Sequence, residues 1–214
     1  MTRRGSSWLT ATIRRFPTTL GLTGVVVAVG VVTSRHSYAH HQETLRWIGI
    51  DLDLLRLDHL WALPVATVVQ SSPGLRWHML LLVAGSLALL EYLAGSLRAL
   101  ITFLLTDWIS SPLTVLALYC LAHLGSSQAL QTLHIPDTGS SAAAHGALGA
   151  AFAVLPKRWS DLALCGFFAY GVTALSFQRI DAALAHLLAS LIGATVGWVV
   201  WRPHVSAVVA DDRH

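Results

Sequence analysis

The sequence contains few charged residues. Asp, Glu, Lys and Arg together make up 12% of the 214 residues, whereas hydrophobic residues make up 54%. Soluble domains carry about 25% charged residues, so this composition excludes an ordinary soluble protein and predicts a membrane protein in contact with the lipid bilayer. The net charge of +3 is interpreted through the positions of the basic residues and not as a nucleic-acid signal, so we expect no nucleic-acid partner.

Cysteine is also scarce. The chain has only Cys120 and Cys165, which both lie in apolar runs and form no CxxC pair. This spacing argues against a disulfide or a zinc site. We expect both side chains to be buried as small apolar groups.

Apolar runs separated by polar segments predict an all-α, polytopic membrane protein with six transmembrane helices. A basic cytoplasmic segment, 1–16, precedes the membrane domain, 17–201, and a cytoplasmic tail, 202–214, follows it. The first loop, 34–74, is long. The expected spans are 17–33, 75–94, 98–123, 139–155, 161–177 and 182–201.

The first apolar run has two interpretations. It resembles the apolar part of a cleaved signal peptide, but no small-x-small cleavage site follows it, and Pro17 fits the start of a helix. We therefore expect a retained span and a multi-pass protein of the cell membrane with a cytoplasmic N-terminus. Most of the 14 basic residues then lie on the inner side, as the positive-inside rule requires. The exceptions are Arg35, Arg46, Arg56, Arg76 and Arg179.

The first loop carries histidines and an amphipathic segment. His36 and His40 are four residues apart and His41 follows them. This spacing could bind a metal, but no carboxylate at matching spacing accompanies it, so we expect solvated loop residues and no metal site. Residues 48–63 alternate leucine with charge, which is typical of a helix lying in the membrane interface.

Two stretches of small residues point to a site. Residues 137–156 contain Ser141 two positions after Gly139, and residues 185–197 contain His186. Both stretches allow neighbouring helices to approach closely. With the six-span topology, Ser141 and His186 both begin their helices near the outer face, at similar depth. The small residues expected at these helix contacts are Gly146, Gly149, Ala189, Gly193 and Gly197.

A serine and a histidine at one depth predict a catalytic dyad. A serine hydroxyl becomes a strong nucleophile when a base takes its proton, and histidine is the usual base. Gly139 and the residues around it could present backbone N–H groups to an oxyanion. His145 lies one turn below Ser141 and could pack on His186. The alternative interpretation is that Ser141 serves only helix packing.

These residues resemble motifs of the rhomboid family of intramembrane serine proteases. Gly139-Ser140-Ser141-Ala142 stands for the family's Gly-x-Ser-Gly, and Ala185-His186 with Gly193 and Gly197 stands for its span-six motif. The resemblance implies Ser141 as nucleophile, His186 as general base and His145 in the place of an aromatic ring against it. It also implies cleavage of single-span membrane proteins near the outer face, without a metal or organic cofactor. Glu91 to Ser96 resembles the end of the family's second span.

The resemblance has departures. Leu75 and Met79 take the positions of the family's His-x-x-x-Asn, whose side chains help to bind the oxyanion. His78 is close to this motif but out of register, and Gln70 is another possible donor. Ala62 replaces the arginine of the first loop's Trp-Arg pair. Alanines at 142 and 189 replace motif glycines.

Two other functions remain open from the sequence. Without the oxyanion side chains, the chain could be a catalytically inactive rhomboid-like protein that binds transmembrane helices of client proteins. Asp107 lies at membrane depth, where a carboxylate is either paired for structural reasons or functional. A small transporter or channel that uses Asp107 is the third interpretation, although no inverted repeat supports it.

Overall fold

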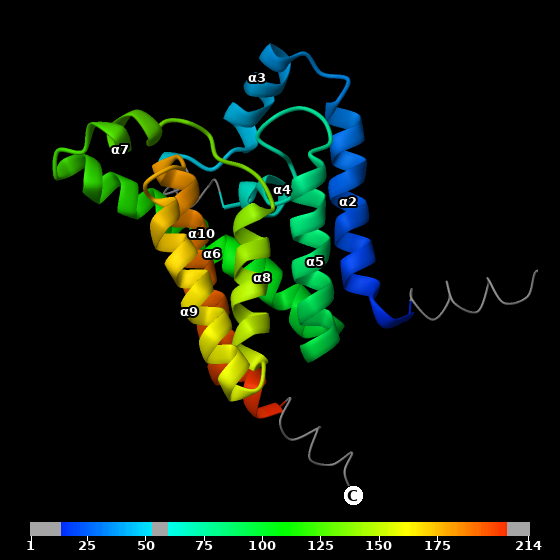
Figure 1. The fold of residues 1–214 in the computed structure, drawn as a ribbon. Coiled ribbons are helices and arrows are strands. Elements are labelled where there is room, and N and C mark those ends of the chain that lie inside the picture. The colour runs from blue at the N-terminus through cyan, green and yellow to red at the C-terminus, as the bar shows by residue number, and fades with distance from the viewer. Residues whose placement is uncertain (1–13, 53–59, 205–214) are drawn as a thin grey trace, which may run out of the picture.

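The regular secondary structure of the described residues is helical, and turns and loops join the helices. The computed structural model describes residues 14–52 and 60–204, and in these ranges the only β-pairing is an isolated bridge between Ile50 and Asp137. The all-α class is therefore confirmed. The helices are α2 (Pro17–Thr33), α3 (Tyr38–Ile48), α4 (Ala62–Ala66), α5 (Trp77–Ala94), α6 (Ser96–His123), α7 (Ser127–Thr132), α8 (Ser141–Val154), α9 (Lys157–Ala174), α10 (Ile180–Val196) and the π-helical turn η3 (Gly197–Trp201) (Figure 1).

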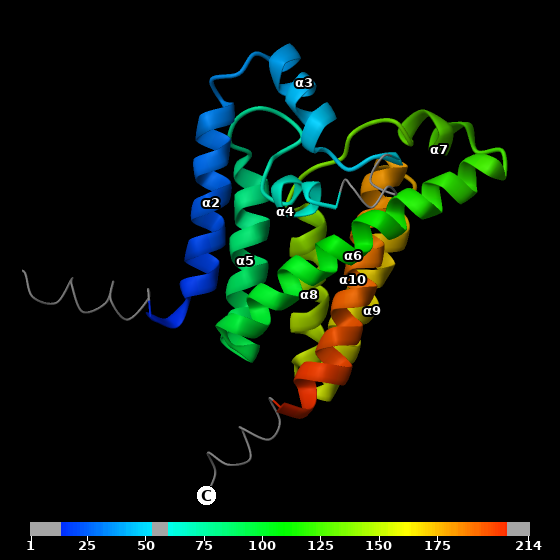
Figure 2. The ribbon, with the colours of Figure 1, turned by 180° about the vertical axis from the view of Figure 1, so that it is seen from behind.

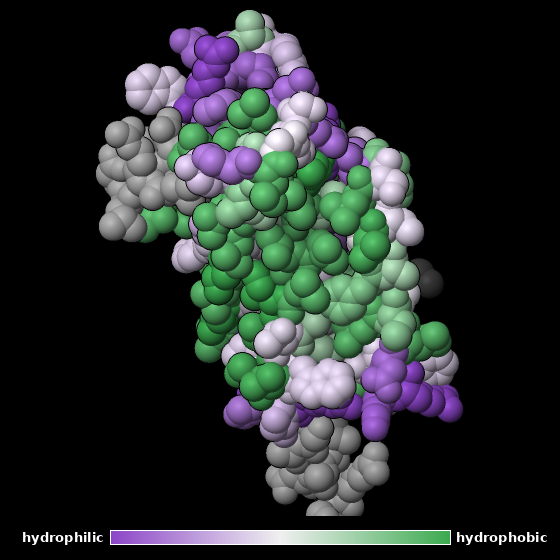
Figure 3. All heavy atoms as spheres, turned by 90° about the vertical axis from the view of Figure 1, so that its left-hand side faces the viewer, coloured by the Kyte–Doolittle hydropathy of each residue, from purple (hydrophilic) through white to green (hydrophobic). Residues whose placement is uncertain are grey.

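Among the described residues, three helices are long and apolar enough to cross a membrane. They are α5, α6 and the continuous helix Ile180–His204, while α2 and α8 are apolar but shorter. Figure 3 shows one side of the molecule, where hydrophobic side chains form a band across the middle and hydrophilic side chains gather at both ends. A surface of this kind suits a protein embedded in a bilayer. Helices occupy all six places where the sequence predicts spans, and the six-span arrangement stays a prediction.

Parts of three expected segments lie outside the described residues. They are most of the basic segment 1–16, most of the tail 202–214, and the centre of the amphipathic stretch 48–63. The ends of that stretch are described. They contain the last residue of α3 and the start of α4.

Helix α8 lies at the centre of the bundle. It stands between α5 on one side and α9 and α10 on the other, and α6 crosses the bundle obliquely behind it (Figures 1 and 2). The largest buried cluster joins alanines of α8 to Phe103 of α6 and to Leu87 and Leu90 of α5. Because α8 presents mostly alanine and glycine, its neighbours pack close to its backbone.

The contact between α2 and the end of α5 depends on Glu91. Its carboxylate accepts hydrogen bonds from the backbone N–H groups of Thr18 (2.9 Å) and Thr19 (2.8 Å) and from Thr19 Oγ1 (2.6 Å). These N–H groups lie in the first turn of α2, which has no partners for them within the helix. A carboxylate is also favoured there by the helix dipole. Gly95 follows with φ +90°, and its left-handed conformation makes the tight turn into α6.

The environment of His41 differs from the sequence-based prediction. Helix α3 begins after Ser37, whose hydroxyl accepts from the His40 N–H at 3.3 Å. His41 is fully buried, and its Nε2 lies 2.8 Å from the carbonyl oxygen of Gln70. The prediction of a solvated residue was therefore wrong for His41, because this ring binds the loop before α5. No cluster of three metal-binding side chains occurs among the described residues.

The two cysteines are also placed differently from the prediction. Both Cys120 and Cys165 are free and exposed, so the prediction of buried side chains was wrong. They lie on outward faces of α6 and α9. An apolar run in a membrane helix does not require burial inside the protein, because lipid solvates its outer face.

Candidate active site

Ser141 is the first residue of α8. The segment before it turns at Gly139, whose φ of +128° is strained for a residue with a side chain. The Gly139 N–H donates to the carbonyl oxygen of Ala66 at 2.9 Å. The next residue, Ser140, is fully buried and its Oγ accepts from Gln70 Nε2 at 3.3 Å. This turn therefore fixes where α8 begins and where the Ser141 hydroxyl lies.

The structure brings Ser141 and His186 together. Oγ of Ser141 lies 3.0 Å from Nε2 of His186, within the distance expected for a nucleophile and its base. For His186 to accept the serine proton, its own proton must lie on Nδ1. Within the described residues Nδ1 is buried and has no hydrogen-bond partner. The arrangement is therefore a dyad, without a carboxylate to orient the imidazole.

Contacts between backbones set the spacing of this dyad. A side chain at Gly193 of α10 would collide with the carbonyl oxygen of Gly146 in α8, and one at Gly149 would collide with that of Ser190. At Gly197, an added Cβ would lie 2.6 Å from the carbonyl oxygen of Ala150. Gly149 and Gly193 thus lie at the α8–α10 contact, and Gly197 lies where η3 continues it. A Cβ at Gly146 would instead meet Thr106 of α6. Ala189 is fully buried and clusters with Ala142 and Ala185 in the same contact.

His145 packs against the imidazole of His186. The two rings are stacked with centroids 4.0 Å apart and planes inclined by 10°. On α9, Phe167 lies nearly parallel to His145 with centroids 5.9 Å apart. His145 Nδ1 is also 2.8 Å from the carbonyl oxygen of Ser141, one turn earlier in α8. The His145 ring is thus held by its own helix and supports one face of the His186 ring.

The carboxylate of Asp107 forms hydrogen bonds at the start of α8. Asp107 is 2% exposed, and its carboxylate accepts hydrogen bonds from the Thr67 hydroxyl and from the backbone N–H of Ala143. The Ala143 N–H belongs to the first turn of α8, where no carbonyl within the helix is available. A carboxylate at this end also interacts favourably with the helix dipole. These bonds give Asp107 a structural role beside Ser141.

Two cavities adjoin the dyad. A small one of about 30 Å³ is lined by Ser141 and His186 together with Asp107, Thr138 and Gly139. A volume of roughly 10–15 Å³ is enough for a water molecule, so this cavity can hold one. A larger cavity of about 400 Å³ also reaches Ser141 and His186, and its polar lining includes Ser72, Arg76 and Thr138. Ser141 and His186 therefore both border space that water can occupy.

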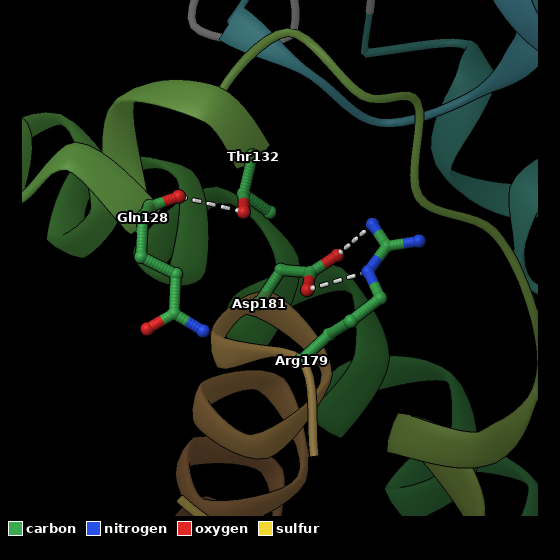
Figure 4. Close-up of polar contacts among 4 residues, drawn as sticks. All are labelled: Gln128, Thr132, Arg179 and Asp181. Carbon is green, nitrogen blue, oxygen red and sulfur yellow. Dashed lines mark hydrogen bonds and ion pairs between the residues drawn. The ribbon is translucent and has the colours of Figure 1, made fainter.

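Charged residues lie at the rim of the larger cavity. Arg179 donates two hydrogen bonds to Asp181 at the start of α10, at 3.1 and 2.6 Å (Figure 4). Asp137 is half-buried beside them. Burial raises the pKa of Asp137 to about 6, the negative charge of Asp181 adds to this, and the guanidinium of Arg179 opposes it. The backbone of Asp137 exchanges hydrogen bonds with Ile50 at 2.8 and 2.9 Å, so the first loop is tied to the segment that leads to Ser141.

The expected oxyanion residues are mostly not available as donors. Met79 lines the larger cavity, but its thioether cannot donate a hydrogen bond. Leu75 packs against Gly30 of α2. His78 is exposed on α5 and is absent from the lining of both cavities. The N–H of Gly139 is already bonded to Ala66. The backbone N–H of Ser141 remains, in the first turn of α8 where no helical partner exists.

The sequence reasoning missed two residues of the site. Arg76 lines the larger cavity and donates to Ser72, yet as an isolated arginine before a span it resembles an ordinary topology signal. Thr138 lines both cavities. Its position three residues before Ser141 was the only signal in the sequence that could have drawn attention to it.

No model of a known protein family, no curated protein and no solved structure matches this chain. The chemistry of the site is therefore inferred from its geometry. A hydroxyl bonded to an imidazole, beside a cavity for water and at a helix start that presents the Ser141 N–H, is suited to acyl transfer.

Proposed function

We propose that this chain is a divergent rhomboid-like intramembrane serine endopeptidase that cuts single-span membrane proteins. The observation that supports the proposal best is the 3.0 Å contact between Ser141 Oγ and His186 Nε2. The stacking of His145 on the His186 ring supports it further, because it restricts the base to one orientation.

The first half-reaction forms an acyl-enzyme. Nε2 of His186 takes the hydroxyl proton of Ser141 while Oγ attacks the carbonyl carbon of the scissile peptide, and the carbonyl oxygen becomes an oxyanion. His186 then gives the proton to the leaving nitrogen, and the C–N bond breaks. The products are an ester on Ser141 and a free amine.

The second half-reaction uses water. A water molecule gives a proton to His186 and attacks the ester carbonyl, and Ser141 Oγ leaves and recovers its proton from His186. The cavity of about 30 Å³ beside both side chains has room for this water. The reaction needs no metal or organic cofactor in this proposal.

The proposal includes the membrane arrangement. The chain has six spans in the cell membrane with a cytoplasmic N-terminus, so the site opens toward the outer face. Helices α3 and α7 lie at the end of the bundle where α8 begins (Figure 1). Substrates would therefore be cut near the outer surface of the bilayer.

A second candidate is a catalytically inactive rhomboid-like protein that binds the transmembrane helices of client proteins. One observation favours it. Neither Leu75 nor Met79 has a hydrogen-bond donor where the rhomboid motif has histidine and asparagine. Loss of one such donor lowers kcat by roughly 10²–10³.

The test is cleavage of single-span reporter proteins by the purified protein in liposomes. Ser141→Ala and His186→Ala should abolish cleavage, since each removes one half of the dyad. Ser86→Ala is the matched control, because it removes a buried hydroxyl of α5 that donates to the carbonyl oxygen of Val83 at 3.0 Å and lines neither cavity, and it should retain cleavage. Absence of cleavage by the wild type, with reporter binding equal in all variants, would overturn the proposal in favour of the second candidate.

A further inference from the structure

The proposed protease lacks a side-chain donor where its motif would place one. Met79 faces the cavity with a thioether, Leu75 packs on α2, and His78 is exposed. The backbone N–H of Ser141 alone would stabilise the oxyanion poorly, because such sites use two or more donors. A further donor should therefore lie in the lining that Ser141 shares with His186.

Thr138 has the properties of that donor. Its side chain is 8% exposed, and its Oγ1 is buried without a hydrogen-bond partner among the described residues. It lines both cavities in company with Ser141 and His186. A buried hydroxyl without a partner is destabilising, and in native proteins such groups are rare and often functional.

The local backbone explains why Thr138 can point into the site. The N–H of Thr138 donates to the carboxylate of Asp137. The backbone N–H and carbonyl oxygen of Asp137 both form hydrogen bonds with the backbone of Ile50. Gly139 then turns with φ +128°. The backbone is thus fixed on both sides of Thr138, which sets the point from which its side chain enters the cavities it shares with Ser141 and His186.

We propose that the Thr138 hydroxyl is an oxyanion donor of this protease and replaces the missing side chains at positions 75 and 79. The inference rests on the proposed function. In the acylation step Ser141 Oγ forms its bond to the carbonyl carbon, and the electron pair of the C=O bond moves to oxygen. Thr138 Oγ1–H donates a hydrogen bond to that oxygen, together with the Ser141 N–H, and keeps its proton throughout.

The experiment compares Thr138→Val with Thr138→Ser in the liposome cleavage assay. Valine has nearly the same shape without the hydroxyl, so kcat should fall by roughly 10²–10³ with KM unchanged. Serine keeps the hydroxyl and should retain most of the activity. Thr132→Val is the matched control, because Thr132 is also 8% exposed but bonds to the Gln128 carbonyl in α7 (Figure 4) and should leave cleavage unchanged.

Two further readouts separate a donor from a structural threonine. Thr138→Val should unfold no more easily than the wild type, since it removes an unpartnered buried hydroxyl. A peptide aldehyde, which forms a tetrahedral adduct with Ser141 Oγ, should bind Thr138→Val more weakly by about the same factor as the loss in kcat, while binding of uncut reporter stays equal.

Three outcomes would overturn the proposal. Full activity of Thr138→Val would do so, and so would a variant that acylates normally and accumulates acyl-enzyme, which would mean that the hydroxyl serves the hydrolytic water. A wild type that neither cuts reporters nor binds the aldehyde would overturn the proposed function as well. In the first two outcomes the wild type still cuts reporters and binds the aldehyde, so only the role of Thr138 is overturned and the proposed function stands.

Discussion

Substitution of Gly193 by alanine is expected to destabilise the protein and to misalign the dyad. The added Cβ would meet the carbonyl oxygen, the carbonyl carbon and the Cα of Gly146. All three are backbone atoms of α8, so no flexible side chain can move aside. Carbon atoms pack at about 3.5–4.0 Å, and α8 and α10 must therefore separate by about 1 Å or more.

The magnitude follows from two opposing effects. Overpacking of a close contact costs about 1–3 kcal/mol, whereas replacing glycine by alanine inside a helix contributes roughly 0.5–1 kcal/mol in its favour. The net loss in free energy of unfolding should therefore lie in the range of roughly 0–2.5 kcal/mol, with about 1 kcal/mol at its centre. Activity should fall further, because a displacement of about 1 Å between reacting groups can lower the rate by 10²-fold.

Reversible denaturation in mixed detergent micelles measures the first quantity, and reporter cleavage measures the second. Gly21→Ala is the matched control, because nothing lies within 4 Å of a Cβ at Gly21 in α2, and it should be neutral or slightly stabilising. A Gly193→Ala protein with both wild-type stability and wild-type cleavage would refute the reasoning, since it would mean that α8 and α10 are not in backbone contact.

Three other perturbations test separate parts of the structure. In the folded protein the pKa of Asp137 is raised to about 6 from an ordinary value of 3.8, so its contribution to stability is largest below about pH 4 and is lost as pH rises to 6. Asp137→Asn should therefore gain stability relative to the wild type as pH rises through this window, measured by unfolding at a series of pH values. A difference in unfolding free energy that stays constant with pH would contradict this prediction. His145→Phe should keep an aromatic ring against His186 and most of the cleavage rate, whereas His145→Ala should lower kcat/KM by roughly two- to tenfold. Equal rates for the two variants would argue against a supporting role for the ring at position 145. Glu91→Gln should cost about 2–3 kcal/mol of unfolding free energy, because an uncharged amide cannot accept all the bonds from the start of α2, and an unchanged denaturation midpoint would show that these bonds are not needed.

The main helices and the dyad could be predicted because their signals are local. Apolar runs bounded by polar turns located the six longest helical segments, and small residues at steps of three or four marked the faces of α8 and α10 that meet. Ser141 and His186 stood out because polar side chains are rare on such faces. Their contact at 3.0 Å could be expected from their matching depth.

The remainder depends on tertiary contacts that leave no local pattern. Helices α3, α4 and α7 lie in the connections between the predicted spans, and their bounds could not be predicted because these helices are short and any amphipathic pattern spans at most a few turns. The burial of His41 depends on the carbonyl of Gln70, 29 residues away. Thr138 could not be singled out because a threonine becomes informative only when its hydroxyl is found buried and unpartnered. The exposed cysteines show the same limit, since a lipid-facing position and a core position in a membrane helix are equally apolar.

The backbone contact between α8 and α10 has a consequence for how such a chain can change over time. Where two helices are spaced by main-chain atoms, the requirement on the sequence is only that a few positions stay small. The outward faces need only remain apolar, which many combinations of residues satisfy. A protein that evolves from this chain could therefore replace most of its residues and keep the same distance between the Ser141 hydroxyl and the His186 imidazole. Evolutionary relationships among proteins of this kind are then visible only at a few glycine and alanine positions.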